Sequence, residues 1–102
     1  MSMQDSDQRF HRLFLLVREF AERAGPAAPA IRYRTKPDEA LDLTLAARRA
    51  LGSRAEWQVI QAAAGLDSPE LPMPEQTLVL PTRELLMALK IEAGFSADEG
   101  LV

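Results

Sequence analysis

Glycine and proline residues divide the chain into short segments, and their positions limit the length of the helices and strands that the chain can form. Gly52, Gly65 and Gly94 each follow a stretch of helix-forming residues, where a helix ends most easily in a left-handed conformation. Gly25-Pro26 ends an earlier helical stretch, and Pro81 closes an apolar run. With 102 residues, the chain is long enough for one modest core but too short for two. We therefore expect short elements around a single core.

Four segments have the pattern of helices. Residues 7 to 24 place apolar side chains three and four positions apart, which predicts an amphipathic helix. Residues 38 to 51 and 53 to 64 predict two shorter helices, the second capped by Ser53. Thr82 is the predicted cap of a last short helix.

Two segments have the pattern of β-strands. Residues 31 to 36 alternate apolar or β-branched side chains with basic ones, which is typical of a half-exposed strand. Residues 77 to 80 form a short apolar run. The order between residues 31 and 81 is therefore strand, helix, helix, strand, which predicts an α+β protein. Residues 1 to 30 add an N-terminal amphipathic helix and a linker, and residues 82 to 102 add a C-terminal helix and tail.

The middle of the chain carries a family signature. Trp57 to Asp67 reads W-Q-V-I-Q-A-A-A-G-L-D, and Leu71 to Pro81 reads L-P-M-P-E-Q-T-L-V-L-P. These stretches resemble the W-x-x-I-x-x-x-N-G-L stretch and the closing P-G-Q-x-L-x-L-P signature of the LysM family. The resemblance implies a LysM-like βααβ module over residues 31 to 81, with a two-stranded antiparallel sheet packed on two helices.

The resemblance also implies where a ligand would bind. In family members that bind glycans, the ligand lies in a shallow groove between the loop after the first strand and the loop before the second. Backbone amides and carbonyls there contact N-acetylglucosamine chains. The corresponding positions in this chain are Asp38, Glu39, Ala40, Leu66, Asp67, Ser68, Pro69 and Leu71. Asp38-Glu39-Ala40 replaces the family's Gly-Asp-Thr entry, and this bulkier, more acidic loop would either narrow the groove or disturb its backbone geometry, which disfavours carbohydrate binding.

Two further sets of residues are candidates for binding another protein. The aromatic residues of the N-terminal helix are Phe10, Phe14 and Phe20. They either cover this module or anchor a partner. The basic residues of the first strand are Arg32, Arg34 and Lys36. Because side chains two positions apart share a strand face, they form a basic ridge that is either solvated or meets a phosphate chain or an acidic partner.

Composition excludes several classes of function. The chain has no cysteine and a single histidine, His11, so neither a thiolate metal site nor a histidine-based triad can form. No glycine-rich phosphate loop is present. We therefore predict that the chain is not an enzyme and uses no metal or cofactor. A net charge of -3 and a pI near 5.1 argue against nucleic-acid partners.

The N-terminus and the apolar clusters indicate where the chain is made. The first residues are polar and acidic, unlike the basic and then apolar start of a secretory signal, so we expect synthesis in the cytoplasm. Apolar clusters such as residues 13 to 17 are far shorter than the roughly 20 residues of a membrane-spanning helix. We therefore expect no membrane insertion.

The resemblance implies a function as well as a fold. LysM-like units occur in wall enzymes and envelope proteins, and also in small proteins of phage tails and contractile injection machines, where they act as structural adaptors. The implied role is a non-catalytic adaptor that binds other proteins of a phage tail, baseplate or related assembly, as a virion structural protein. The alternative is a module that binds peptidoglycan. A third interpretation, a helical regulator or chaperone, predicts a chain without a two-stranded sheet.

Overall fold

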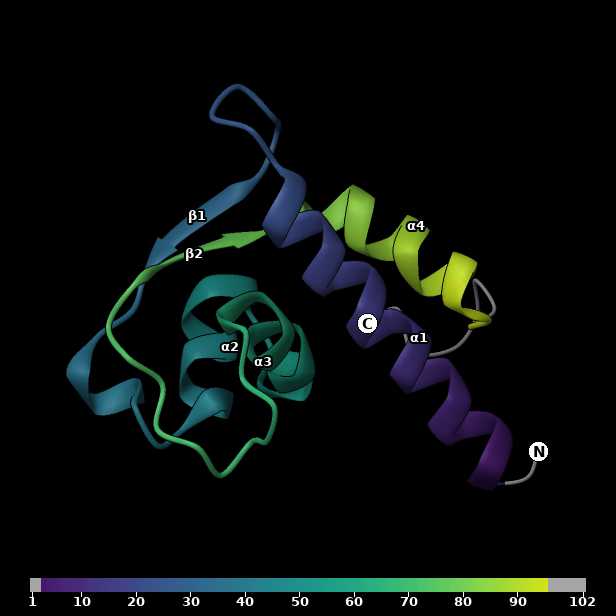
Figure 1. Cartoon of the computed structure of the whole chain (residues 1–102), viewed down its shortest axis with the longest axis horizontal. Coiled ribbons are helices and arrows are strands. Elements are labelled where there is room, and N and C mark those ends of the chain that lie inside the picture. The colour runs from purple at the N-terminus through teal and green to yellow at the C-terminus, as the bar shows by residue number, and fades with distance from the viewer. Residues whose placement is uncertain (1–2, 96–102) are drawn as a thin grey trace.

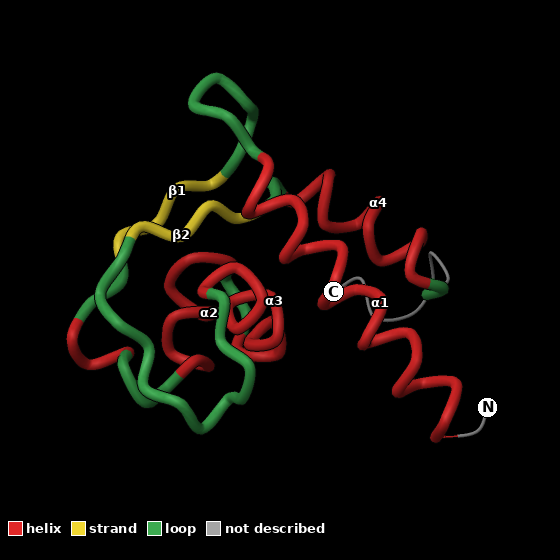
Figure 2. Tube along the Cα trace, in the orientation of Figure 1, coloured by secondary structure: helices red, strands yellow, loops and turns green. Residues whose placement is uncertain are grey.

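A two-stranded antiparallel sheet lies beside four α-helices in the computed structural model, which describes residues 3 to 95 and side chains from residue 8 onward (Figures 1 and 2). The helices and strands are α1 (Met3–Arg23), β1 (Ile31–Arg34), α2 (Leu43–Leu51), α3 (Trp57–Ala64), β2 (Thr77–Leu80) and α4 (Arg83–Ala93). Two 3-10 turns, Pro37–Glu39 and Arg54–Glu56, precede α2 and α3. The predicted α+β class is confirmed, while the predicted tail lies outside the described residues.

The sheet has one buried face and one exposed face. Ile31 of β1 lies opposite Leu80 of β2, and Tyr33 lies opposite Leu78. Leu78 and Leu80 are fully buried, whereas the alternating residues of β1, such as Arg34, are exposed. Because alternate side chains point to opposite faces, the buried face packs toward α2 and α3 (Figure 1). The presence of this sheet contradicts the chain without a two-stranded sheet that the helical-regulator interpretation predicted.

The N-terminal helix packs on the rest of its own chain. Leu13 and Val17 of α1 are buried in the same core as the sheet residues. Arg12 Nη1 donates a hydrogen bond to the carbonyl oxygen of Ala93 at 3.1 Å, which ties α1 to the end of α4. The two helices lie side by side and run in opposite directions (Figure 1). The apolar stripe of α1 is therefore largely used inside the molecule.

The start of α2 differs from the prediction. The helix begins at Leu43 rather than at Asp38, and its cap is Asp42, whose Oδ1 accepts a hydrogen bond from the Leu45 N–H at 3.1 Å. Residues 37 to 39 form a 3-10 turn instead, because the side chain of Glu39 turns into the core. The predicted end is confirmed, since Gly52 has a left-handed φ of 82°.

Candidate binding surfaces

The loop after β1 and the loop before β2 are held together by backbone hydrogen bonds. The Met73 N–H donates to the carbonyl oxygen of Ala40 at 2.8 Å. Nearer the sheet, the Thr35 N–H donates to the carbonyl oxygen of Gln76, and the Gln76 N–H donates to Thr35 Oγ1, both at 2.9 Å. The loops that the family resemblance places on either side of a groove are therefore neighbours in space.

A hollow of about 240 Å³ lies beside these loops, and we call it the loop hollow. Its lining residues are Leu41, Asp42, Leu43, Thr44, Trp57 and Pro69. Leu41 is 77% exposed, and Leu71, two residues beyond Pro69, is 46% exposed. The loop hollow thus has an aromatic residue, Trp57, in its wall and one aliphatic lining residue, Leu41, that is open to solvent.

Several of the predicted glycan-binding residues have structural roles. Glu39 and Leu66 are buried. The carbonyl oxygen of Leu66 accepts a hydrogen bond from Arg18 Nη2 at 2.8 Å, while the exposed Asp67 carboxylate lies 3.7 Å from Arg18 Nη1. These contacts join α1 to the loop before β2.

The remaining predicted positions lie at the surface or along the loops. The Ser68 hydroxyl donates to a Glu70 carboxylate oxygen at 2.7 Å, and Pro69 lines the loop hollow. The Ala40 carbonyl oxygen is occupied by the Met73 N–H. Of the eight predicted positions, the structure thus brings Pro69 to the wall of the hollow, while Leu71 is exposed and is not a lining residue.

Glu39 lies at the centre of a buried hydrogen-bond network. Its carboxylate accepts hydrogen bonds from the Tyr33 hydroxyl at 2.5 Å, from the Lys36 N–H at 2.7 Å and from Arg49 Nη1 at 3.0 Å. Burial alone would raise the pKa of Glu39, but these three hydrogen bonds outweigh it and the pKa is lowered. Burial and the hydrogen bond to Glu39 raise the pKa of Tyr33 to about 12.

Asp38 extends this network to the surface. Both of its carboxylate oxygens accept hydrogen bonds from the guanidinium of Arg49, at 2.8 and 2.9 Å. The hydrogen bond from Arg49 is the main reason that the pKa of Asp38 is lowered, and the same contacts raise the pKa of Arg49. The side chains of Asp38 and Glu39 are therefore already paired within the chain, which leaves them a structural role.

The phenylalanines of α1 have partners within the chain. Phe10 remains 42% exposed but packs edge-on against Phe95, with ring centroids 5.1 Å apart. The guanidinium of Arg18 lies 4.4 Å from the centroid of the Phe14 ring. Phe20 is half-buried and lines an open groove between α1 and α4. Of the three, Phe10 is the most accessible to a partner.

The basic residues in β1 and just after it differ in their contacts. The guanidinium of Arg32 donates to three carbonyl oxygens of the preceding linker, those of Gly25, Pro26 and Ala28, at 2.9 to 3.3 Å. Arg34 and Lys36 are exposed, and neither side chain makes a hydrogen bond or ion pair with another described residue. The predicted basic ridge therefore has one fixed member and two that face solvent.

A buried ion pair is the feature that the sequence did not suggest. Lys90 Nζ of α4 lies 2.6 Å from a carboxylate oxygen of Glu56, and both side chains are about nine-tenths buried. The pair lies in the wall of two hollows, of about 270 and 160 Å³. No sequence pattern marks it, because the two residues are 34 positions apart.

The described residues show neither a metal site nor a membrane span. No group of three or more histidine, cysteine, aspartate or glutamate residues among them is placed to hold a metal ion. No helix between residues 3 and 95 combines the length and apolar character needed to cross a membrane. Comparisons with protein-family models, curated proteins and solved structures found no match.

Proposed function

We propose that the protein is a LysM-like, non-catalytic adaptor that binds other proteins of a phage tail, baseplate or related assembly. What supports the LysM-like part is the order β1, α2, α3, β2, with β1 and β2 paired antiparallel. What supports the adaptor part is the loop hollow, where Leu41 exposes aliphatic surface beside Trp57 and Pro69, together with the exposed Leu71 two residues after Pro69. Apolar side chains grouped in this way are typical of sites where another protein docks.

The hydrogen bonds within the loops favour a protein over a sugar as the ligand of the loop hollow. A glycan is held by polar groups that are free to bond to it, but the Ala40 carbonyl oxygen already accepts from the Met73 N–H. The Asp42 carboxylate oxygen Oδ1 accepts from both the Leu45 N–H and the Thr44 hydroxyl. The groups that remain open at the loop hollow are mainly apolar, and these suit burial against another protein.

Peptidoglycan binding is the second candidate, and Trp57 is the observation that favours it. An indole ring in the wall of a surface hollow can stack on the apolar face of a sugar ring, and Pro69 and Asp42 lie in the same wall. This module would bind N-acetylglucosamine polymers at the place where the resemblance puts the groove.

One experiment separates the two candidates. The tagged chain would be co-expressed with the products of its neighbouring genes, and also sedimented with insoluble peptidoglycan. A Leu41→Asp, Leu71→Asp double variant places charge in the loop hollow at Leu41 and on the loop before β2 at the exposed Leu71. Leu15→Asp is the control, because Leu15 is 49% exposed on α1 and does not line the hollow.

Each outcome supports or removes one candidate. The adaptor predicts a co-purifying protein that the double variant loses and the Leu15 variant keeps, with no sedimentation on peptidoglycan. Saturable sedimentation that the double variant loses would instead assign the hollow to glycan. A chain that stays monomeric and retains no co-expressed protein would remove the adaptor proposal.

A further inference from the structure

The outer edge of β1 carries backbone groups that the sheet does not use. In an antiparallel pair, residues that exchange hydrogen bonds alternate with residues that do not. The Thr35 N–H bonds to the carbonyl oxygen of Gln76, which continues the register of the sheet by one position. Tyr33 and Ile31, two and four residues earlier, are therefore bonded to β2. The N–H and C=O groups of Arg32 and Arg34 must point away from β2.

This edge is open in the described structure. None of the backbone hydrogen bonds outside the helices and the sheet involves Arg32 or Arg34. In Figures 1 and 2, β2 lies between β1 and the helices α2 and α3, so β1 is at the margin of the molecule. An open edge with unpaired donors and acceptors is a place where an extended segment can add as a further strand.

The charges along the outer edge of β1 determine which kind of extended segment can pair with it. Arg34 and Lys36 are exposed, and their side chains have no hydrogen bond or ion pair with another described residue. A second copy pairing through β1 would place like charges opposite one another, which destabilises a strand pair. An acidic segment would place carboxylates beside these cations instead. The protein as a whole has a net charge of -3, so the basic ridge is a local exception.

We propose that the outer edge of β1 binds an extended acidic segment of a partner protein, which pairs with the main chain of Arg32 and Arg34 as a third strand. Acidic residues at every second position of the segment lie on the exposed face, near Arg34 and Lys36. The hydrogen bonds of Arg32 to the linker carbonyls hold the start of β1 in place for this pairing. The inference deepens the proposed function and rests on it in taking the ligand to be a protein.

The test uses the whole chain and a labelled, capped peptide that alternates glutamate and valine over six residues. Binding is followed by fluorescence anisotropy, and backbone amide exchange is followed by NMR. We expect saturable binding, weakened about tenfold in an Arg34→Gln, Lys36→Gln double variant. Arg48→Gln is the matched control, because Arg48 is exposed on α2 and its side chain has no described hydrogen bond or ion pair. This variant should bind as the wild type does.

Amide exchange distinguishes strand addition from attraction between charges. On binding, exchange of the Arg32 and Arg34 amides should slow, whereas exchange of the Tyr33 amide, already bonded to β2, should change little. A peptide of the same sequence with N-methyl groups on alternate residues keeps its charges but loses donors, so it should bind much more weakly. Equal binding of the methylated peptide, or unchanged exchange at Arg32 and Arg34, would overturn the proposal.

The result is separable from that of the proposed function. No peptide binding, together with a co-purifying protein that depends on Leu41 and Leu71, would overturn the edge proposal and leave the adaptor standing. Peptide binding with slowed exchange, but no co-purifying protein, would do the reverse. If the chain alone dimerises and slows exchange at Arg32 and Arg34, the occupant is a second copy, and the acidic-segment proposal is wrong.

Discussion

Shortening Val17 to alanine tests whether α1 is part of the folded unit. Val17 is fully buried among core residues contributed by the sheet and by α3. Val17→Ala removes two methyl groups, worth about 0.8 kcal/mol each, so the loss from burial is roughly 1.6 kcal/mol. The cavity left behind adds to this loss, while the better helix propensity of alanine returns roughly 0.5 kcal/mol. We expect a net loss of about 1.5 to 2 kcal/mol in the free energy of unfolding.

The assay is urea unfolding, monitored both by circular dichroism and by the fluorescence of Trp57, the single tryptophan. With an m-value of about 1.5 kcal/mol per molar urea, the midpoint should fall by roughly 1 M. The control is Leu15→Ala, which removes a larger but half-exposed side chain from the same helix and should change stability by less than about 0.5 kcal/mol. If Val17→Ala left the Trp57 midpoint unchanged, α1 would not be packed on the module.

Two further predictions concern buried polar groups. Tyr33 is the only tyrosine in the sequence, so the absorbance of tyrosinate reports on its hydroxyl alone. The midpoint of this pH titration should be about 12 rather than the ordinary 10.0, and Glu39→Gln should lower the midpoint. Because folding raises the pKa of Tyr33, the stability that the protonated hydroxyl contributes is complete below pH 10 and is lost as the pH rises to about 12. A titration midpoint near 10 in the folded protein would contradict the network. In a double-mutant cycle, Glu56→Leu and Lys90→Met should each lower the free energy of unfolding by about 2 to 3 kcal/mol, because each removes the ion-pair partner of a buried charge. The double variant should lose less than the sum of the two single losses. Strictly additive losses would show that the pair does not interact.

The sequence predicts the structure best where residues close together in the chain determine the backbone conformation. The helix ends at Gly52 and Gly65 and the cap at Thr82 are all confirmed, because a left-handed glycine or a capping hydroxyl acts over three or four residues. The two strands were also predicted, since alternation and a short apolar run are local patterns. Their antiparallel pairing, by contrast, was implied by the family resemblance.

Contacts between residues far apart in the sequence explain where the prediction of α2 was wrong. Asp38 and Glu39 have the acidic character of a first helical turn, but Arg49, ten and eleven residues later, and Tyr33 draw them into the network that precedes α2. Asp42 was the better signal, because it stands three residues before the apolar Leu45 whose N–H it caps. At the candidate site, Pro69 follows from the resemblance, whereas the exposure of Leu41 depends on how the loops meet.

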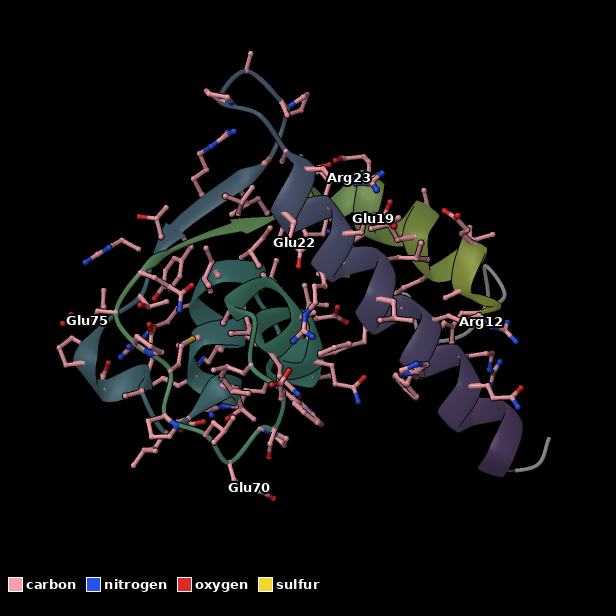
Figure 3. The ribbon with its side chains drawn as sticks, viewed as in Figure 1. Arg12, Glu19, Glu22, Arg23, Glu70 and Glu75 are labelled. Atoms are coloured by element: carbon pink, nitrogen blue, oxygen red, sulfur yellow. The ribbon has the colours of Figure 1, made fainter. Side chains whose placement is uncertain are left out.

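The antiparallel packing of α1 against α4 brings the beginning of one helix to the end of the other, where Phe10 meets Phe95 and Arg12 meets Ala93. Figure 3 places Arg12 on the opposite side of the molecule from Glu70 and Glu75, which belong to the loop before β2. A tag, a linker or a neighbouring polypeptide joined at this end would therefore leave the loops reachable. The adaptor proposed above would accordingly be held at its helical end and present its loops at the other. Coupling through that end is the orientation to choose for a sensor surface.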